Sequence, residues 1–299
     1  MPAFSARYAA LFDFVAPARA RAEVWRTLVG LAIAGACYLV ALQLMFFAAM
    51  VLLGPLRGTF TPAELARGSS PAALLALLFS YLPLTGGLAL GLALMMNRGL
   101  GSLIGPIRPA IRNFLWVAVP LLALWLALMP LSVLSDNVGR HLTLGQQLPW
   151  LPLALIGLLI QTGTEELVFR GYLQQQLAAR HAAPILWMGL PALAFGALHY
   201  MPGQYGASAW FVVIWAVCFG LAAADLTART GNLGAAVGLH FANNAASLLL
   251  VGLYGRMDGL ALYNTVLNLG EPLAQLPYLA IDAVSLLVGW LAARLILRV

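Results

Sequence analysis

Uncharged apolar stretches separated by short polar segments follow one another along almost the whole chain. Several of them reach the roughly twenty residues that a helix needs to cross the hydrocarbon layer of a bilayer. They are expected at about 27–54, 72–96, 113–135, 148–168, 184–199, 208–226, 232–253 and 275–297. The pattern therefore predicts an all-α fold, a multi-pass membrane helical bundle of about eight transmembrane helices.

Two of these stretches carry features that interrupt a straight span. Pro120 and Pro130 lie inside the third stretch, and the fifth stretch is short and ends at His199. Proline removes a helical hydrogen bond and kinks or breaks a helix. The pattern thus allows a kink or a re-entrant segment at either place, and a total of seven or nine helices.

The composition supports the membrane assignment and gives an orientation. Hydrophobic residues make up 62% of the chain and charged residues only 9%, whereas about a quarter of the residues in soluble domains are charged. Loops rich in basic residues stay in the cytoplasm. With a cytoplasmic N-terminus, only Arg57, Arg67, Arg140 and Arg256 of the sixteen arginines face the other side. We expect a multi-pass protein of the cell inner membrane with both termini cytoplasmic.

The remaining charge and the N-terminus fit the same assignment. The net charge of +6 is interpreted as a signal for orientation and lipid headgroups, and no nucleic-acid partner is expected. Segment 1–26 bears arginines and precedes a long apolar stretch. We expect this segment to be a retained anchor rather than a cleaved signal peptide.

Polar residues inside or beside the predicted spans gather in the second half of the chain. An ionisable group at membrane depth costs several kcal/mol unless it is paired or hydrated, so such residues mark functional sites. The set comprises Glu165, Glu166, Arg170, His199, Asp225, His240, Asn243, Asn244 and Asp282.

Helical spacing divides the roles of the two adjacent glutamates. Glu166 and Arg170 are separated by four residues, with the acid first, which favours an ion pair on one helix face. Glu165 lies about 100° around the helix from Glu166, so both carboxylates cannot face the same arginine. The spacing assigns Glu166 to structure and leaves Glu165 available.

Each of these residues also has a plain structural interpretation. In this interpretation Glu166 and Arg170 form an ordinary helix ion pair, and His199, a lone histidine at the end of a span, extends to the membrane interface. His240 and Asn244, also four residues apart, serve equally well as hydrogen bonds between helices. Asp225 has Arg229 four residues later and is interpreted as a helix-end pair, whereas Asp282 has no predicted partner.

Three short motifs occur together and in order. They are "EELVFR" from Glu165, "FGALH" from Phe195 to His199, and "HFANN" from His240. This order resembles the EExxxR, FxxxH and HxxxN pattern of the CAAX protease and bacteriocin-processing family (CPBP or Abi), intramembrane proteases related to the Rce1-type prenyl protease. The resemblance covers roughly residues 150–250.

The resemblance divides the chain into parts of a single membrane domain. Residues 1–145 supply about three N-terminal membrane helices, 146–255 form the catalytic core that is similar to the family, and 256–299 form a C-terminal loop and the last transmembrane helix. The implied activity is hydrolysis of a peptide bond in a membrane-associated protein or peptide. The expected partners are that substrate and the lipid bilayer.

The residues can support hydrolysis by an activated water molecule. A carboxylate shielded from solvent is a stronger base, which suits Glu165, and His199 can hold the same water. His240 and Asn244 can donate hydrogen bonds to the oxyanion of the tetrahedral intermediate. The resemblance implies the same four catalytic roles and gives Glu166, Arg170 and Phe195 supporting ones.

Two alternatives remain open. Glu165, His199 and His240 are also zinc ligands by type. However, the sequence has no HExxH helix and Asn244 is a poor ligand, so we favour a glutamic mechanism without a cofactor. From another class, a proton-coupled transporter or a non-catalytic peptide-binding or immunity protein would also place ionisable residues in the membrane. Prenylated proteins, bacteriocin precursors and signalling proteins all remain candidate substrates.

Overall fold

Helices make up most of the structure, a computed structural model that describes residues 5–51, 61–268, 271 and 275–299. In these residues six helices are long and apolar enough to cross a membrane. They are Val24–Ala48, Pro71–Met96, Ile107–Val133, Leu151–Arg180, Pro202–Thr230 and Leu276–Leu297. The predicted all-α, multi-pass membrane bundle is confirmed.

The predicted number of eight transmembrane helices is not confirmed. Each of the eight apolar stretches contains a helix, but two of these helices fall short of the span length: Ile185–Leu198 and the helix that begins at Gly234. Both short helices carry motif residues. The predicted end of the first stretch, 52–54, and Arg57 lie outside the described residues.

The α-helices are α1 (Ala9–Val15), α2 (Val24–Val51), α3 (Pro62–Arg67), α4 (Pro71–Phe79), α5 (Leu82–Gly91), α6 (Gly101–Ile104), α7 (Ile107–Val133), α8 (Leu144–Gln147), α9 (Leu151–Glu166), α10 (Gln174–Arg180), α11 (Leu190–Leu198), α12 (Pro202–Tyr205), α13 (Ala209–Thr230), α14 (Gly234–Ala245) and α15 (Leu276–Leu297). Short 3₁₀ turns are η1 (Ala6–Tyr8), η2 (Ala16–Arg21) and η6 (Gly206–Ser208). Wider π-helical segments are η3 (Leu92–Met96), η4 (Leu167–Leu173), η5 (Ile185–Gly189) and η7 (Ala246–Leu250).

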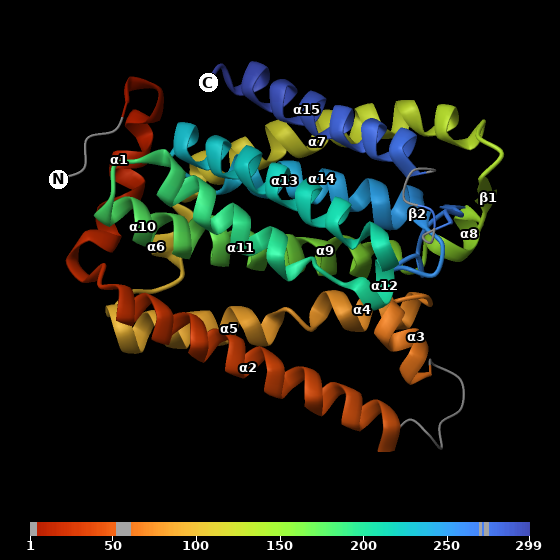
Figure 1. The fold of residues 1–299 in the computed structure, drawn as a ribbon, viewed down its shortest axis with the longest axis horizontal. Helices are drawn as coiled ribbons and strands as arrows, with labels where there is room; N and C mark the ends of the chain where they lie inside the picture. Colours follow the sequence, from red (N-terminus) through yellow and green to blue (C-terminus); the bar gives the residue numbers. More distant parts are fainter. Residues whose placement is uncertain (1–4, 52–60, 269–270, 272–274) are drawn as a thin grey trace.

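The motif-bearing helices occupy the middle of the bundle (Figure 1). Helices α9, α11, α13 and α14 lie between two outer pairs, α2 with α5 on one side and α7 with α15 on the other. Helix α1 and the C-terminal end of α15 lie toward the same end of the bundle, while α3 and β1 lie toward the opposite end (Figure 1). This placement agrees with an even number of crossings and with the charge asymmetry, because Arg67 belongs to α3 and Arg140 to β1.

Helix α14 packs closely against α7 because its contact face consists of small residues. A Cβ atom added to Gly234 would overlap the backbone carbonyl of Ala110 in α7. Small residues of this kind allow two membrane helices to approach at backbone distance. Helix α7 itself continues through Pro120 and Pro130, so the re-entrant segment considered at these prolines is not formed.

A small three-stranded sheet closes one end of the bundle and was not predicted. Its strands are β1 (Val138–Arg140), β2 (Val251–Leu253) and β3 (Tyr263–Thr265), in the order β1-β3-β2, with β1 antiparallel and β2 parallel to β3. The end of the seventh predicted span, 251–253, is therefore a strand, and the predicted C-terminal loop that begins at 256 contains another. Three-residue strands show too little alternation for the sequence pattern to reveal them.

Candidate active site

Helix α9 ends within the bundle, at the pair of glutamates. Glu165 and Glu166 close this helix, and the π-helical segment η4 begins at the next residue, Leu167. Only 8% of Glu165 and none of Glu166 is exposed. π-helical turns are rare and occur often at functional sites, and here the wider turn carries Arg170 directly after the acidic pair.

Glu166 and Arg170 form a fully buried ion pair, as their spacing predicted. Arg170 Nη1 donates to Glu166 Oε1 at 2.9 Å, and both side chains are almost completely excluded from solvent. The guanidinium lies 4.7 Å from the centre of the Phe195 ring and 5.9 Å from that of Phe219. Aromatic faces stabilise a desolvated cation, so these rings help to hold the arginine at membrane depth.

Room for this arginine depends on Gly220 in α13. A Cβ atom at this position would lie 2.9 Å from the backbone of Ala192 in α11 and 3.4 Å from Arg170 Nη2. The absent side chain lets α11 and α13 pack closely above the ion pair. The two helices thereby bring the Phe195 motif next to the glutamates.

His240 contacts both glutamates. Its Nδ1 atom lies 2.8 Å from Glu166 Oε1, and its Nε2 atom lies 3.5 Å from Glu165 Oε2. Because a carboxylate accepts hydrogen bonds, Nδ1 carries a proton and donates to Glu166. The longer contact exceeds normal hydrogen-bond distance, so Nε2 faces Glu165 without a direct bond.

His199 lies at the end of α11 and is oriented by its own helix. The Nδ1 atom is 2.8 Å from the Phe195 carbonyl oxygen, which accepts a hydrogen bond from it. The imidazole also packs on the Phe195 ring, with centroids 4.5 Å apart, and the same ring lies 6.1 Å from His240. A proton held on Nδ1 leaves the Nε2 lone pair of His199 free to accept.

Asn244 lies one turn beyond His240 and is tied to α9. Its amide nitrogen donates to Gln161 Oε1 at 2.9 Å, and its oxygen accepts from the amide of Asn243 at 3.2 Å. An asparagine amide has two N–H donors, so the bond to Gln161 uses one of them. Gln161 was not singled out from the sequence, although it lies one turn before Glu165 in the same helix.

The first half of the chain also contributes to the site, which the sequence did not reveal. Tyr81, at the junction of α4 and α5, interacts through its hydroxyl with the Glu165 carboxylate. Thr85 lies one turn after Tyr81 in α5, and its hydroxyl forms a hydrogen bond of 2.6 Å with that of Thr164, the residue before Glu165. The Tyr38 ring packs against Tyr81 with centroids 5.6 Å apart. Hydroxyl groups from the first half therefore join the polar residues that gather in the second half.

The three residues of the zinc alternative can be compared with their placement in the structure. No group of three His, Cys, Asp or Glu residues in the described part of the chain is placed to hold a metal ion. His240 and His199 use Nδ1 on Glu166 and on the Phe195 carbonyl, and Nε2 of each ring has no hydrogen bond within the described residues. We therefore derive no step through a metal.

The two other acidic residues of the predicted set lie outside this cluster. Asp225 pairs with Arg229 at 2.8 Å near the end of α13, as predicted. Asp282 of α15 lines a pocket of about 510 Å³ together with Asn243, Ser285 and Tyr278. Within the described residues, Asp282 has no ion pair or hydrogen bond.

Comparisons with known proteins agree with the motif resemblance. Residues 147–246 match the family model described as Type II CAAX prenyl endopeptidase Rce1-like. The match includes all three motifs and Gln161, and it leaves out Tyr81 and α15. It confirms the resemblance inferred from the motifs and supports an enzyme of the CAAX-protease type.

The curated relative that matches is itself of unknown function. Over 133 residues the chain is 29% identical to the uncharacterized protein YyaK of Bacillus subtilis (strain 168), and the aligned part covers 44% of this chain and 44% of that protein. No solved structure matches.

Proposed function

We propose that this protein is an intramembrane endopeptidase in which Glu165 activates a water molecule for attack on a peptide bond. The observation that carries the proposal is that the carboxylates of the two adjacent glutamates have different partners. Glu166 is engaged by Arg170 and by His240 Nδ1, whereas Glu165 forms no ion pair with an arginine among the described residues and faces His240 Nε2 at 3.5 Å. A buried carboxylate without a cation is suited to take up a proton.

In the first step Glu165 takes a proton from water, and the water oxygen attacks the carbonyl carbon of the substrate. His199 assists because its Nε2 lone pair accepts a hydrogen bond from the same water and thereby fixes its orientation. The Tyr81 hydroxyl interacts with the Glu165 carboxylate and helps to hold it in place. Glu165 then passes the proton to the leaving amine, the C–N bond breaks, and a carboxylate and an amine are formed.

The oxyanion of the tetrahedral intermediate is stabilised by Asn244 and His240. Asn244 supplies the N–H that its bond to Gln161 leaves unused. His240 begins as the neutral imidazole with its proton on Nδ1, which donates to Glu166. The proton that Glu165 takes from water is passed to His240 Nε2, 3.5 Å away, which donates to the oxyanion, and the proton returns through Glu165 to the leaving amine. Donors fixed in a water-poor site before the reaction are worth the most to the transition state.

The substrate is a peptide or protein at the membrane, and the enzyme is a multi-pass protein of the inner membrane with both termini cytoplasmic. The sequence pattern, in which only Arg57, Arg67, Arg140 and Arg256 of the sixteen arginines are expected on the other side, supports this orientation. The description of the matching family suggests prenylated CAAX peptides as first probes.

The direct test is hydrolysis by the purified protein in proteoliposomes. A fluorescent peptide that ends in a farnesylated CAAX sequence is compared with its unprenylated form and with a panel of membrane-anchored peptides. In oxygen-18 water, mass spectrometry should find one heavy oxygen in the new carboxyl group. The control variant is Glu23→Gln, a surface glutamate in an exposed pair with Arg26, which should cleave at the wild-type rate. Absence of cleavage across the panel, with a folded protein, contradicts the proposal.

Metal dependence is tested separately. We expect activity to survive chelation, and elemental analysis to find less than stoichiometric zinc. If stoichiometric zinc were found and its removal abolished cleavage, Glu165, His199 and His240 would instead be assigned as zinc ligands that come together when the metal binds.

A further inference from the structure

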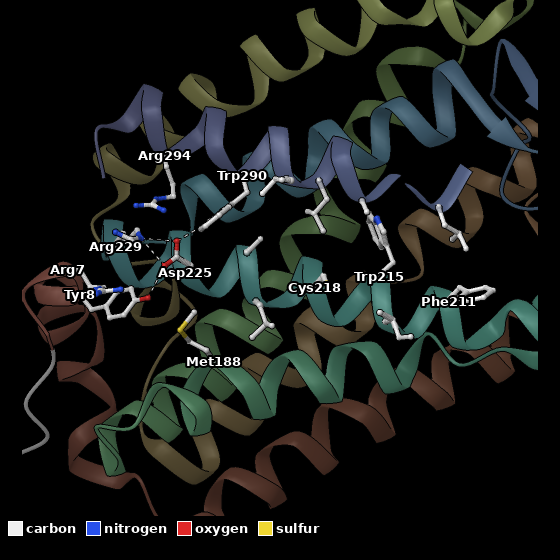
Figure 2. A pocket seen from close by; sticks show the side chains of 17 residues that line it. Arg7, Tyr8, Met188, Phe211, Trp215, Cys218, Asp225, Arg229, Trp290 and Arg294 are labelled. Carbon is white, nitrogen blue, oxygen red and sulfur yellow. Dashed lines mark hydrogen bonds and ion pairs between the residues drawn. The ribbon is translucent and has the colours of Figure 1, made fainter. Parts of the chain in front are cut away.

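A second pocket lies between α13 and α15 (Figure 2), and neither Glu165 nor Glu166 lines it. Its volume is about 730 Å³, and most of its lining is apolar. On α13 the lining residues recur every three or four positions: Phe211, Ile214, Cys218, Leu221 and Asp225. This spacing keeps them on one helix face. The face extends about 27 Å from Phe211 to Arg229, at roughly 1.5 Å per residue.

One end of this groove is polar and firmly organised. Asp225 accepts hydrogen bonds from the Tyr8 hydroxyl at 2.9 Å, from Arg229 Nε at 2.8 Å and from Trp290 Nε1 at 3.0 Å (Figure 2). Burial and the neighbouring carboxylate raise the pKa of Tyr8, so its hydroxyl keeps the proton and remains a donor. The contacts join α13 to α15 and to the N-terminal segment, which gives the groove a fixed end.

Three arginines surround this end, and one carboxylate offsets them. Arg7, Arg229 and Arg294 line the pocket together with Asp225. Arg229 uses Nε on Asp225, and Arg294 uses Nε on the Val299 carbonyl. Arg7 has no hydrogen bond or ion pair within the described residues. With three cations and one anion, the polar end carries a net charge of +2, and the terminal nitrogens of all three guanidinium groups have no hydrogen bond among the described residues.

We propose that this groove binds one anionic phospholipid, with the phosphate among Arg7, Arg229 and Arg294 and an acyl chain along the apolar face of α13 and α15. Guanidinium groups recognise phosphate through paired N–H donors. The three arginines belong to the set expected on the cytoplasmic side, where the groove entrance would lie at the headgroup level. The charge and the apolar groove are continuous, as a lipid requires, and the site does not depend on the proposed catalytic chemistry.

Native mass spectrometry of the full chain in detergent, titrated with phosphatidylglycerol or phosphatidylcholine of the same acyl chains, tests the proposal. We expect phosphatidylglycerol to bind about 30-fold more tightly, from about 1 kcal/mol for each of the two uncompensated arginines. The double variant Arg7→Gln/Arg294→Gln should lose this preference. Arg140→Gln, a matched change in exposed β1, should keep it.

A second variant separates a groove from a charged surface. Ala283 of α15 lines the apolar part of the pocket and is exposed, so Ala283→Phe should fill the groove without disturbing the core. We expect it to weaken phosphatidylglycerol binding at least fivefold while the arginines are intact. Unchanged binding in Ala283→Phe would reduce the site to surface electrostatics. Equal binding of both lipids, or binding of a farnesyl chain in their place, would also overturn the proposal.

Discussion

Two ion pairs of identical spacing lie in this molecule, and their surroundings differ. Glu166 with Arg170 and Asp225 with Arg229 are both an acid followed by arginine four residues later, at 2.9 Å and 2.8 Å. The first pair lies at the centre of the bundle with side chains 0% and 1% exposed, and the second lies near a helix end with side chains 8% and 11% exposed.

The partners of the two carboxylates explain what each pair does. Asp225 also accepts from a tyrosine and a tryptophan, so its pair joins three segments of the chain. Glu166 accepts from His240, a residue that also faces a second carboxylate, and its arginine is enclosed by aromatic rings. The outer pair organises an interface between segments, whereas the inner pair positions an imidazole beside Glu165. Spacing predicts pairing, but the remaining neighbours determine the role.

The largest expected effect is on stability and distinguishes the two pairs. Glu166→Gln leaves Arg170 buried without its partner, which costs about 3–5 kcal/mol for a buried pair. Asp225→Asn removes the negative charge that accepts these hydrogen bonds. Because this pair is more exposed to solvent, we expect a smaller loss of stability, about 1–3 kcal/mol. Thermal unfolding in matched detergent should therefore show a larger decrease in Tm for Glu166→Gln. Equal decreases in Tm would mean that the inner ion pair contributes no more to stability than the outer one, and would contradict this comparison.

The next effect concerns Asn244, the amide donor proposed to stabilise the oxyanion. Asn244→Ala should lower kcat by about 10²–10³, or about 2.7–4 kcal/mol, if the amide stabilises the oxyanion. The binding of substrate should change little. Asn243→Ala is the matched control, since this neighbouring asparagine donates only to Asn244. Similar losses in both variants would indicate a packing defect in α14.

Packing around the inner pair can be disturbed without changing a charge. Gly220→Ala forces α13 away from α11 and toward Arg170, and overpacking of this kind costs about 1–3 kcal/mol. Gly86→Ala in α5 is the control because a Cβ atom there meets nothing within 4 Å. The Tm of the first variant should fall, and that of the second should stay or rise. A Gly220→Ala protein of wild-type stability would show that the helices can separate freely.

The smallest effect tests the contribution of the first half of the chain. Tyr81→Phe keeps the ring and removes the hydroxyl that interacts with Glu165. We expect kcat to fall about tenfold, which corresponds to about 1.4 kcal/mol, with KM and Tm nearly unchanged. Tyr38→Phe, one ring further from Glu165, should retain most of the activity. A Tyr81→Phe enzyme with full kcat would remove Tyr81 from the site.

The sequence predicted the inner region in part. The pairing of Glu166 with Arg170 and of Asp225 with Arg229 followed from positions on one helix, where spacing fixes direction. The family motifs implied a catalytic role for His240, but its approach to both glutamates was not predicted. Contacts between distant segments stayed hidden. Tyr81 and Thr85 lie about eighty residues before their partners, and an uncharged hydroxyl in an apolar stretch gives no signal of its own.

The fold shows the same division. Each long apolar stretch contains a helix, because about twenty uncharged residues in a row have few alternatives, whereas short helices such as α1, α3 and α8 lie outside these stretches and were not predicted. The sheet was not predicted because its strands have three residues each. The segments before β2 and β3 are held by a side chain, Gln147, which donates to the carbonyls of Leu249 and Leu260. The close packing of α7 and α14 likewise depends on backbone contact at Gly234, which the sequence pattern alone does not reveal.

The central claim is that Glu165 is the base, and one comparison tests it most directly. Glu165→Gln keeps the size and shape of the side chain but cannot take a proton from water. We expect hydrolysis of the cleaved peptide to fall at least about 10², with an unchanged Tm, while Glu23→Gln cleaves normally. His199→Ala should lose a comparable amount, and the double variant little more, because both residues act on one water. Cleavage by folded Glu165→Gln at the wild-type rate would contradict the account.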